Sequence, residues 1–385
     1  MSVLIYVIYN KKLMGNKVEI IAFYLPQFHP MPDNDEWWGK GFTEWTNVGK
    51  AKALFKGHNQ PRVPADLGYY DLRLPIIREQ QVELAKEAGV TAFCYWHYWF
   101  GNGKRLMADI FDEVLNTGKP DFPFCLGWAN HSWYAKNWNS DGTSTNKLLI
   151  EQTYPGIDDV KMHFAFLLKA FKDSRYVKID NKPFLLIFDP ISIPDEYIRN
   201  FKCWTEEAGF DGLYLVANIT SSSISKKELL AKGFDVVTYQ RLGGMANPQL
   251  HKLGKVGRGL FKIYQYAKGF ILKRPPRMID YSKYYHSLIT EDDQCVDVIP
   301  SIIPQWDHTP RSGWNGSLLV NSTPYFFYKH VLEALDAIKN KPQNQQILLL
   351  KSWNEWGEGN YMEPDLKNGK GYIEALKEAL NKSLE

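Results

Sequence analysis

The sequence predicts an α/β protein whose core is a (β/α)8 barrel, or TIM barrel, in a single domain with long loop insertions. Short apolar runs alternate with segments of helical pattern eight times along the chain. The runs are apolar throughout, which is typical of parallel strands covered on both faces. No glycine-rich phosphate turn follows the first run, and this disfavours a doubly wound sheet, the alternative fold.

Each apolar run has the length of a strand and precedes a segment with helical spacing of apolar residues. Strands are expected at 18–25, 90–96, 122–128, 183–188, 213–218, 234–239, 296–303 and 346–353. Helices are expected at 71–88, 104–117, 158–172, 194–208, 225–232, 281–290, 324–339 and 371–382. The first helix has its apolar residues on one face and ends at Gly89. Eight such units are the repeat number of a (β/α)8 barrel.

The barrel domain is expected to span residues 18–385, after an N-terminal extension of residues 1–17. The extension has a short apolar run without a basic segment before it or a small-residue cleavage site, so it is a poor signal peptide. We expect translation to begin at Met14, which the intact mass of the natural product would test. A first insertion, at about 26–70, is irregular and rich in tryptophan, which is typical of a cleft wall.

A second insertion, at about 241–280, is basic. Residues 236–279 contain nine Lys and Arg and no acidic residue. Within it four apolar residues have helical spacing: Leu260, Ile263, Ala267 and Ile271. A helix of this kind can lie on an anionic membrane, so peripheral membrane contact through 252–277 is one interpretation. The alternative is a helix packed on the barrel with solvated basic residues.

The composition points toward carbohydrate and away from nucleic acid. The net charge of +3 is too small to indicate a nucleic-acid partner. Aromatic residues make up 15% of the chain, with 13 Trp and 22 Tyr. Aromatic rings offer flat faces to sugar rings and polar tips to wet clefts.

The cysteines and the hydropathy pattern predict a compartment. Cys94 and Cys125 lie inside apolar runs, where they read as buried thiols of a reducing compartment. No apolar stretch has the roughly 20 residues that a membrane span needs. We therefore expect a cytoplasmic location, with peripheral contact at the inner membrane as one option.

Residues that follow the strands are the candidates for substrate binding, because a barrel of this kind carries its chemistry at the carboxyl ends of its strands. Amides, aromatics and carboxylates, which bind vicinal hydroxyls and stack on sugar faces, follow nearly every expected strand. The expected substrate-binding residues, with one from the first insertion, are Tyr24, Gln27, His29, Trp45, Trp96, His97, Trp99, Trp128, Asn130, His131, Gln240, Gln305, Trp306, Asp307, Trp353 and Asn354.

Two glutamates in the segment WNEWGEGNYMEP are the candidate catalytic residues. Glu355 and Glu358 lie three apart, directly after the last strand. Cleavage of a glycosidic bond uses an acid and a second carboxylate, which usually face each other across the sugar. Two glutamates on one loop therefore suggest another arrangement, or a partner such as Asp307 or Asp189. The alternative is that both glutamates are solvent-exposed loop residues without a catalytic role.

No metal or cofactor is expected. His29, His97 and His131 follow strands, but none has a partner at a compact ligand spacing. Imidazoles that bind sugar hydroxyls or orient a carboxylate are the favoured interpretation.

Four motifs in this order resemble one known family: AFYLPQFHPMPDNDEWWGKGFTEWTNV, FCYWHYWF, GWANHSW and WNEWGEGNYMEP. Together they are similar to the WbsX-type glycosyltransferases of bacterial O-antigen and capsule clusters, which are also described as glycoside hydrolase family 99-like. The similarity extends from about Glu19 to about Ala379. It implies a (β/α)8 fold, in agreement with the strand count.

The resemblance also implies roles for the two glutamates. In family 99 enzymes the first Glu of a Glu-x-x-Glu pair removes the proton of the substrate's own 2-hydroxyl. That oxygen attacks the anomeric carbon to form a 1,2-anhydro sugar, and the second Glu is the acid and base for leaving group and acceptor. Carried over, Glu355 is the base and Glu358 the acid/base. The nucleophile then belongs to the substrate, which explains two catalytic glutamates on one loop.

Three functions follow as hypotheses. The first is a transferase or transglycosidase of surface-polysaccharide synthesis, acting on an oligosaccharide or on a lipid-linked or nucleotide-activated sugar. The second is an endo-acting glycoside hydrolase, favoured by the retained glutamate pair. Water and a sugar hydroxyl differ little as acceptors, and the loops select between them. The third is a non-catalytic carbohydrate-binding protein, for which the paired glutamates would be unnecessary.

Overall fold

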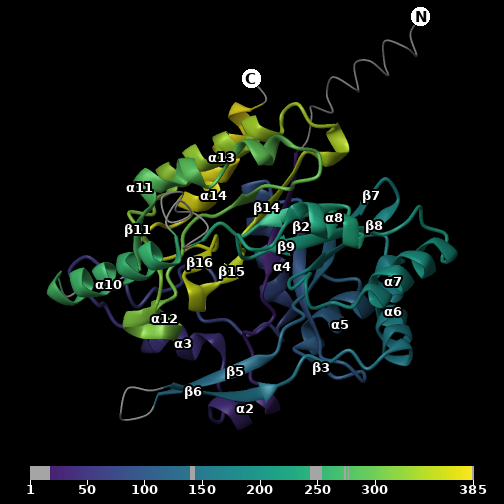
Figure 1. The fold of residues 1–385 in the computed structure, drawn as a ribbon, viewed down its shortest axis with the longest axis horizontal. Helices are drawn as coiled ribbons and strands as arrows, with labels where there is room; N and C mark the ends of the chain where they lie inside the picture. The colour runs from purple at the N-terminus through teal and green to yellow at the C-terminus, as the bar shows by residue number, and fades with distance from the viewer. Residues whose placement is uncertain (1–17, 139–143, 243–253, 273–274, 276, 384–385) are drawn as a thin grey trace, which may run out of the picture.

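The computed structural model describes residues 18–138, 144–242, 254–272, 275 and 277–383. The N-terminal extension and the proposed start at Met14 lie outside the described residues. The fold is a nearly closed (β/α)8 barrel in one domain, as the sequence predicted (Figure 1). The eight barrel strands are β1 (Glu19–Tyr24), β2 (Ala92–Trp99), β4 (Phe124–Trp128), β8 (Lys182–Ile187), β9 (Tyr214–Ile219), β10 (Val236–Tyr239), β12 (Ser301–Ile302) and β14 (Ile347–Leu350).

The strands are parallel and lie in the order β10-β9-β8-β4-β2-β1-β14-β12. The ring closes between its two ends through backbone hydrogen bonds. The Val237 N–H donates to the Asp297 carbonyl at 2.9 Å, and the Ile299 N–H donates to the Val237 carbonyl at 2.8 Å. Parallel strands that point the same way bring all their carboxyl ends to one face, where the site is expected.

The barrel strands are apolar along their length because both of their faces are covered. Ile20, Ile21 and Ala22 of β1 are fully buried, and so are all four residues of β14. The helices that cover the outside are α4 (Pro75–Ala88), α5 (Ala108–Thr117), α6 (Ile157–Phe171), α7 (Asp195–Glu207), α8 (Lys226–Lys232), α13 (Pro324–Ile338) and α14 (Gly371–Lys382). Strand interiors and helix faces form one continuous core.

Insertions after the strands carry the remaining elements. The first insertion contains α2 (Pro32–Trp38) and α3 (Glu44–Lys50). Short strands add β3 (Arg105–Leu106), β7 (Lys178–Ile179) and a hairpin of β5 (Trp133–Trp138) with β6 (Ser144–Ile150). The later insertions contain α10 (Lys255–Leu272), β11 (Met278–Asp280), α11 (Tyr281–Tyr284), α12 (Thr309–Ser312), β13 (Leu318–Val320), β15 (Asn354–Glu355) and β16 (Asn360–Tyr361).

Two expected elements differ from the structure. The helix expected at 281–290 is only α11 followed by 3₁₀ turns, because Thr290 starts a new turn with a capping box to Asp293. The strand expected at 296–303 is reduced to the two residues of β12 and a single bridge at Val298. Pro300 lies between these two pairings and has no N–H to donate to a ladder.

Other boundaries move for local reasons. The helix expected from residue 71 begins at Pro75, a residue that favours the first helical position. The strand expected at 90–96 extends to Trp99, where β3 pairs with its end. Within the described residues, no helix combines the length and the apolar character needed to cross a membrane.

Candidate active site

Glu355 and Glu358 lie on the loop that follows the last barrel strand. β15 ends at Glu355, and a single 3₁₀ turn, Trp356–Glu358, carries the second glutamate before β16 begins. Residues three apart lie nearly above one another in a 3₁₀ turn. The short turn therefore brings the two carboxylates close enough for each to influence the ionisation of the other. Both residues are only half-buried, so a substrate can reach them.

Arg311 of α12 bridges two carboxylates from different insertions. Its guanidinium contacts Glu358, and its Nη2 lies 2.9 Å from Oε2 of Glu44 on α3. The Glu44 side chain is only 4% exposed, and those of Glu358 and Arg311 are 16% and 26% exposed. Charge-assisted hydrogen bonds in such a partly dry site are strong and directional. His308 adds a weaker contact, with its Nε2 3.7 Å from Oε1 of Glu358.

The contact with the Arg311 guanidinium makes the pKa values of the two glutamates differ. Burial and the neighbouring Glu358 carboxylate raise the pKa of Glu355 to about 7, against the opposing charges of Lys351 and Arg311. Burial also acts to raise the pKa of Glu358, but Arg311, His308 and Lys351 outweigh it and hold this pKa below its ordinary value. Near neutral pH, Glu358 is therefore ionised and Glu355 is close to its titration midpoint.

Gly357 lets the loop approach the Glu44 carboxylate. A Cβ placed on Gly357 would lie 1.9 Å from Oε2 of Glu44 and 3.2 Å from Nε of Arg311. No side chain fits this space while the Glu44–Arg311 ion pair stays in place. The glycine between the two glutamates therefore belongs to the geometry that holds Arg311 against Glu358.

Backbone and amide contacts fix the loop on the barrel. The side chain of Asn354 accepts from the Leu25 N–H at 2.7 Å and donates to the Leu25 carbonyl at 3.0 Å. The Asp307 N–H donates to the Glu358 carbonyl at 2.7 Å. The ends of β1, β12 and β14 are thereby joined at the glutamate pair. Asn354, expected to bind substrate, makes these two backbone contacts instead.

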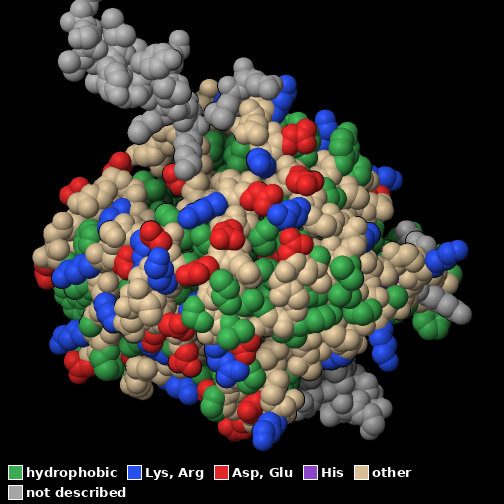
Figure 2. All heavy atoms as spheres, turned by 180° about the vertical axis from the view of Figure 1, so that it is seen from behind, with side chains coloured by type: hydrophobic (Ala, Val, Ile, Leu, Met, Phe, Trp, Pro, Cys, Tyr) green, Lys and Arg blue, Asp and Glu red, His purple; other side chains and the backbone are tan. Residues whose placement is uncertain are grey.

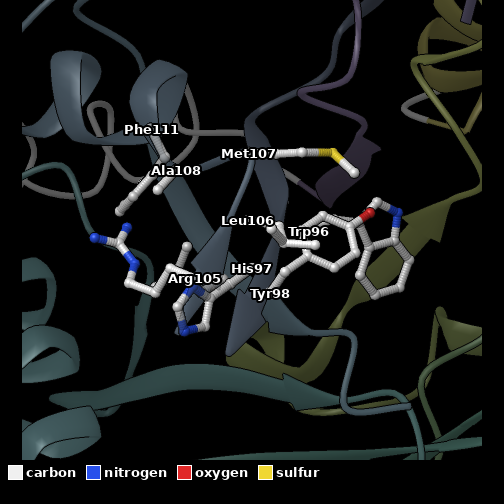
Figure 3. Close-up of a pocket in the computed structure, with 9 residues that line it drawn as sticks. Trp96, His97, Tyr98, Arg105, Leu106, Met107, Ala108 and Phe111 are labelled. Carbon is white, nitrogen blue, oxygen red and sulfur yellow. The ribbon is translucent and has the colours of Figure 1, made fainter. Parts of the chain in front are cut away.

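The aromatic residues at the end of β2 divide between its two faces, because side chains alternate along a strand. Trp96 stacks on Phe23 with ring centres 4.8 Å apart, and Tyr98 lies on the same side of the strand (Figure 3). Burial raises the pKa of Tyr98, and the Glu355 carboxylate raises it further, so the phenol lies within electrostatic range of the pair.

His97 and Trp99 point to the other side of β2, toward α6. His97 Nε2 lies 2.9 Å from His163 Nε2, and the Trp99 indole donates to Asp159. Figure 3 shows the His97 ring directed away from Trp96 and Tyr98, in a small cavity between β2 and α5. The void of about 10 Å³ has room for one water and none for a sugar. His97 and Trp99, expected to bind substrate, pack against helices.

Several other expected residues make packing contacts. Trp128 is fully buried and donates to the Trp99 carbonyl at 3.0 Å. The Tyr24 hydroxyl donates to Gln81 at 2.7 Å inside the core, and Trp353 is fully buried. The amide of Asn130 donates to the Asp189 carbonyl at 2.8 Å and accepts from the Asp189 N–H at 2.7 Å.

Asp307 and Gln305 form a buried polar network behind the site. Asp307 accepts hydrogen bonds from Gln60 Nε2 at 2.7 Å and from the Thr309 hydroxyl at 2.6 Å, and it lies 2.8 Å from His58. Burial acts to raise the pKa of Asp307, but these partners and Arg62 lower it to about 2. Gln305 accepts from Arg62 and donates to the Tyr361 carbonyl. These contacts occupy both side chains.

The remaining expected residues lie at the carboxyl ends of strands or in the first insertion. The buried Nδ1 atoms of His29 and His131 have no hydrogen-bond partner within the described part of the chain, and burial lowers the pKa of both rings. Trp45 donates to the Tyr70 carbonyl at 2.7 Å. Gln27 is buried and Gln240 is half-buried.

Trp306 contacts two basic side chains that lower the pKa of Glu358. The Lys351 ammonium lies 5.2 Å above its ring, and the His308 ring stacks on it at 6.0 Å. Trp306 is only 8% exposed, whereas Trp96 is half-buried, so Trp96 is the better candidate for sugar contact of the two.

Sequence reasoning missed Arg311, Glu44 and Lys351. Glu44 stands in the quoted motif FTEWTNV and Lys351 directly precedes the last loop, but Arg311 follows a Pro in an irregular stretch. Tyr98 could have been assigned from the alternation along β2. Only the fold brings α3, α12 and the last loop together. No group of three or more His, Cys, Asp or Glu in the described ranges is arranged to hold a metal ion.

Two solved structures are similar to this chain in fold. The GH99 endo-alpha-mannosidase from Bacteroides thetaiotaomicron, in complex with bis-tris propane, superposes with a TM-score of 0.57 at 14% identity, over 95% of this chain and 97% of that chain. A protein described as glycoside hydrolase-like gives a TM-score of 0.55 at 15% identity, with 94% of each chain covered. At these identities the likeness concerns the fold.

Sequence comparison shows the family to which the chain belongs. The chain is 31% identical over 381 residues to the uncharacterized protein WxcX of Xanthomonas campestris pv. campestris strain B100, covering 94% of this chain and 50% of WxcX. It thus spans about half the length of that relative. The protein is a (β/α)8-barrel protein. The model of the family Glycosyltransferase WbsX matches residues 20–376, and the chain belongs to this family.

Proposed function

We propose that this enzyme is a glycosyltransferase of bacterial surface-polysaccharide assembly, O-antigen or capsule, that moves a sugar from a phosphate-linked donor to a hydroxyl acceptor. One observation carries the proposal: Arg311 contacts the carboxylate of Glu358. A carboxylate held ionised in this way cannot protonate a leaving oxygen. A phosphate can leave without that proton. A sugar alkoxide is a poor leaving group and needs it.

In the first step Glu355 acts as the base. Its carboxylate takes the proton of the donor's 2-hydroxyl, whose oxygen attacks the anomeric carbon. The bond between that carbon and the phosphate oxygen breaks, and the phosphate leaves with the electron pair. A base whose pKa lies near 7 combines a useful ionised fraction with useful basicity.

In the second step Glu358 acts as the base for the acceptor. It takes the proton of the acceptor hydroxyl, whose oxygen bonds to the anomeric carbon while the 1,2-anhydro ring opens. Protonated Glu355 returns its proton to the departing 2-oxygen, and Glu358 releases its proton to water. The resemblance assigns Glu358 both acid and base work, and the Arg311 contact favours the base half.

The chemistry limits the donor. Internal attack by the 2-oxygen requires a 2-hydroxyl trans to the leaving group, as in an α-mannosyl donor. The endo-alpha-mannosidase activity named for the structural neighbour is consistent with this configuration. We propose a nucleotide-activated or lipid-linked donor and a cytoplasmic location, with peripheral contact at the inner membrane. The half-buried Trp96 would provide a face for a sugar ring.

An endo-acting hydrolase is the second candidate, and one observation favours it. With a pKa of about 7, Glu355 is half protonated at neutral pH and could serve as the acid, with Glu358 as the base that activates water. Leaving-group dependence separates the two functions. A panel of aryl glycosides with the trans 2-hydroxyl would be compared, each as dinitrophenyl and methoxyphenyl glycoside.

The transferase mechanism predicts turnover of dinitrophenyl glycosides and almost none of methoxyphenyl glycosides, because no protonated acid assists departure. In Arg311→Gln the ratio of the two rates should shrink, since Glu358 then holds a proton more readily. Arg73→Gln, which changes an exposed arginine, is the control. Equal rates for both leaving groups in the wild type would favour the hydrolase.

The biological test is made in cells. The gene is deleted and restored as wild type or as Glu355→Gln/Glu358→Gln, and the repeat unit of the surface polysaccharide is measured by mass spectrometry. A repeat that lacks one sugar, restored only by the wild type, supports a transferase. An intact repeat with altered chain length supports the hydrolase or a transglycosidase. Rescue by the double variant would remove the glutamates from the mechanism.

A further inference from the structure

The helix α10 presents its apolar face to solvent. Seven of its apolar side chains are each more than half exposed, with Phe270 at 84% and Val256 at 78%. Leu272 is the last residue of the helix, and the other six are Val256, Leu260, Ile263, Tyr264, Phe270 and Ile271. Their spacing puts them on one face of the helix. A surface helix normally turns its apolar stripe to the core, so this orientation is the reverse of the usual one.

The helix stands apart from the barrel. In Figure 1 it extends outward at one edge of the molecule, and Figure 2, seen from behind, shows a projection at the opposite edge. Among the described residues, α10 shares no extended interface with another helix or strand. Gly269, off the apolar face, is buried. The apolar face is therefore not covered by another helix or strand of the described residues, and contiguous apolar surface of this kind marks an interaction site.

The charge of the segment indicates the kind of partner. From residue 252 to residue 277 the sequence has eight Lys and Arg and no acidic residue. Clusters of this size on an amphipathic helix are attracted to anionic lipid headgroups. The described helices do not include one that could span a bilayer, so α10 would lie in the interface and not cross it.

We propose that α10 docks the enzyme on an anionic lipid bilayer, with its apolar face in the headgroup region and its basic residues near the phosphates. A second copy of this chain fits less well, because pairing two such faces would bring two basic segments together. An acidic protein surface would match the charge but would need an apolar groove of its own. The bilayer supplies both features along its whole surface.

The position of α10 in the fold gives the docking a use, and this step rests on the proposed transferase function. The insertion begins after β10, whose carboxyl end lies on the same barrel face as the glutamate loop after β14. Docking through α10 would therefore hold the open end of the barrel near the membrane, where lipid-linked sugars are found.

The test measures binding of the full chain to vesicles by co-sedimentation. Vesicles of phosphatidylglycerol and phosphatidylcholine in equal parts are compared with vesicles of phosphatidylcholine alone. The variant Ile263→Asp/Phe270→Asp changes the centre and end of the apolar face. Val296→Asp, at an exposed apolar residue before β12, is the matched control. Circular dichroism and thermal unfolding confirm that each variant is folded.

We expect the wild type to bind the anionic vesicles at least about tenfold more tightly than the neutral ones, with added salt weakening the binding. Ile263→Asp/Phe270→Asp should lose at least about tenfold, and Val296→Asp should bind like the wild type. The catalytic variant Glu355→Gln/Glu358→Gln should also bind like the wild type, so docking is judged separately from catalysis.

Three results would overturn the proposal. The first is a wild type that does not sediment with anionic vesicles. The second is equal vesicle binding by Ile263→Asp/Phe270→Asp and by the control Val296→Asp. The third is a dimer in size-exclusion chromatography that only Ile263→Asp/Phe270→Asp dissociates. The last result would assign the apolar face to a second copy of the chain.

Discussion

Raising the pH through about 7 is expected to activate the enzyme, because Glu355 must be ionised to take the proton of the 2-hydroxyl. Burial and Glu358 raise the pKa of Glu355 to about 7, and Glu358 stays ionised over the same range because Arg311 lowers its pKa. For one group with this midpoint, the ionised fraction rises from ~1% at about pH 5 to ~90% at about pH 8. The expected gain in kcat/KM is therefore roughly 90-fold.

Two measurements check the sign of this change. The first is kcat/KM for a dinitrophenyl glycoside across the pH range at constant ionic strength. The second is an NMR titration of carboxyl carbons in protein labelled with ¹³C-glutamate, with Glu355→Gln used to assign the signal. This titration needs no substrate. Because Arg311 acts on both carboxylates, Arg311→Gln should move both titrations to higher pH, and more so for Glu358, which it contacts.

A falling limb through about pH 7 would refute the base role, because a group that must be protonated loses activity as it ionises. Such a result, with the same NMR titration, would make Glu355 the acid and favour hydrolysis. If the NMR midpoint of Glu355 lay near the ordinary value for a glutamate, the electrostatic argument itself would be wrong.

Three further predictions test the surroundings of the pair. Gly357→Ala should cost about 1–3 kcal/mol of unfolding free energy in urea and most of the turnover, because its Cβ would displace Glu44; unchanged turnover would contradict this. Glu363→Gln should cost about 1–3 kcal/mol, since this buried acid accepts three hydrogen bonds; wild-type unfolding would contradict it. Trp96→Ala should raise KM for the glycoside, and Trp99→Ala should lower the melting temperature. If Trp99→Ala raised KM and Trp96→Ala lowered the melting temperature, Trp99 would be the substrate contact and Trp96 the packing residue.

The periodicity of the sequence predicted the barrel well because each strand is buried on both faces and each helix on one. Seven strands and seven helices were placed to within a few residues. The errors fall where a local rule competes with the run of apolar residues. Pro300 interrupts the seventh strand, and the Thr290 capping box replaces the end of a helix. The alternation along β2 was not used, so Trp96 and His97 were treated alike.

The composition of the site was harder to predict for a physical reason. Residues at strand ends are polar or aromatic both when they bind ligands and when they join the loops to the barrel. Asn354 and Asp307 are of the second kind, since their hydrogen bonds go to backbone and neighbouring side chains. Arg311 and Glu44 are 267 positions apart, and nothing in the local sequence of either indicates the other.

The placement of Arg311 bears on the donor chemistry that we propose for this barrel. Two glutamates three apart in a 3₁₀ turn would share their protons if nothing distinguished them, because like charges at short range cannot both ionise freely. The Arg311 guanidinium, which forms an ion pair with Glu358 and acts on Glu355 only from a longer range, breaks this symmetry. It suits the pair to a leaving group that needs no proton, and its removal would return an acid to the site. Under the proposed mechanism, the choice between a phosphate donor and a glycosidic bond would thus depend on a residue outside the glutamate loop, which contacts Glu44 beside Gly357.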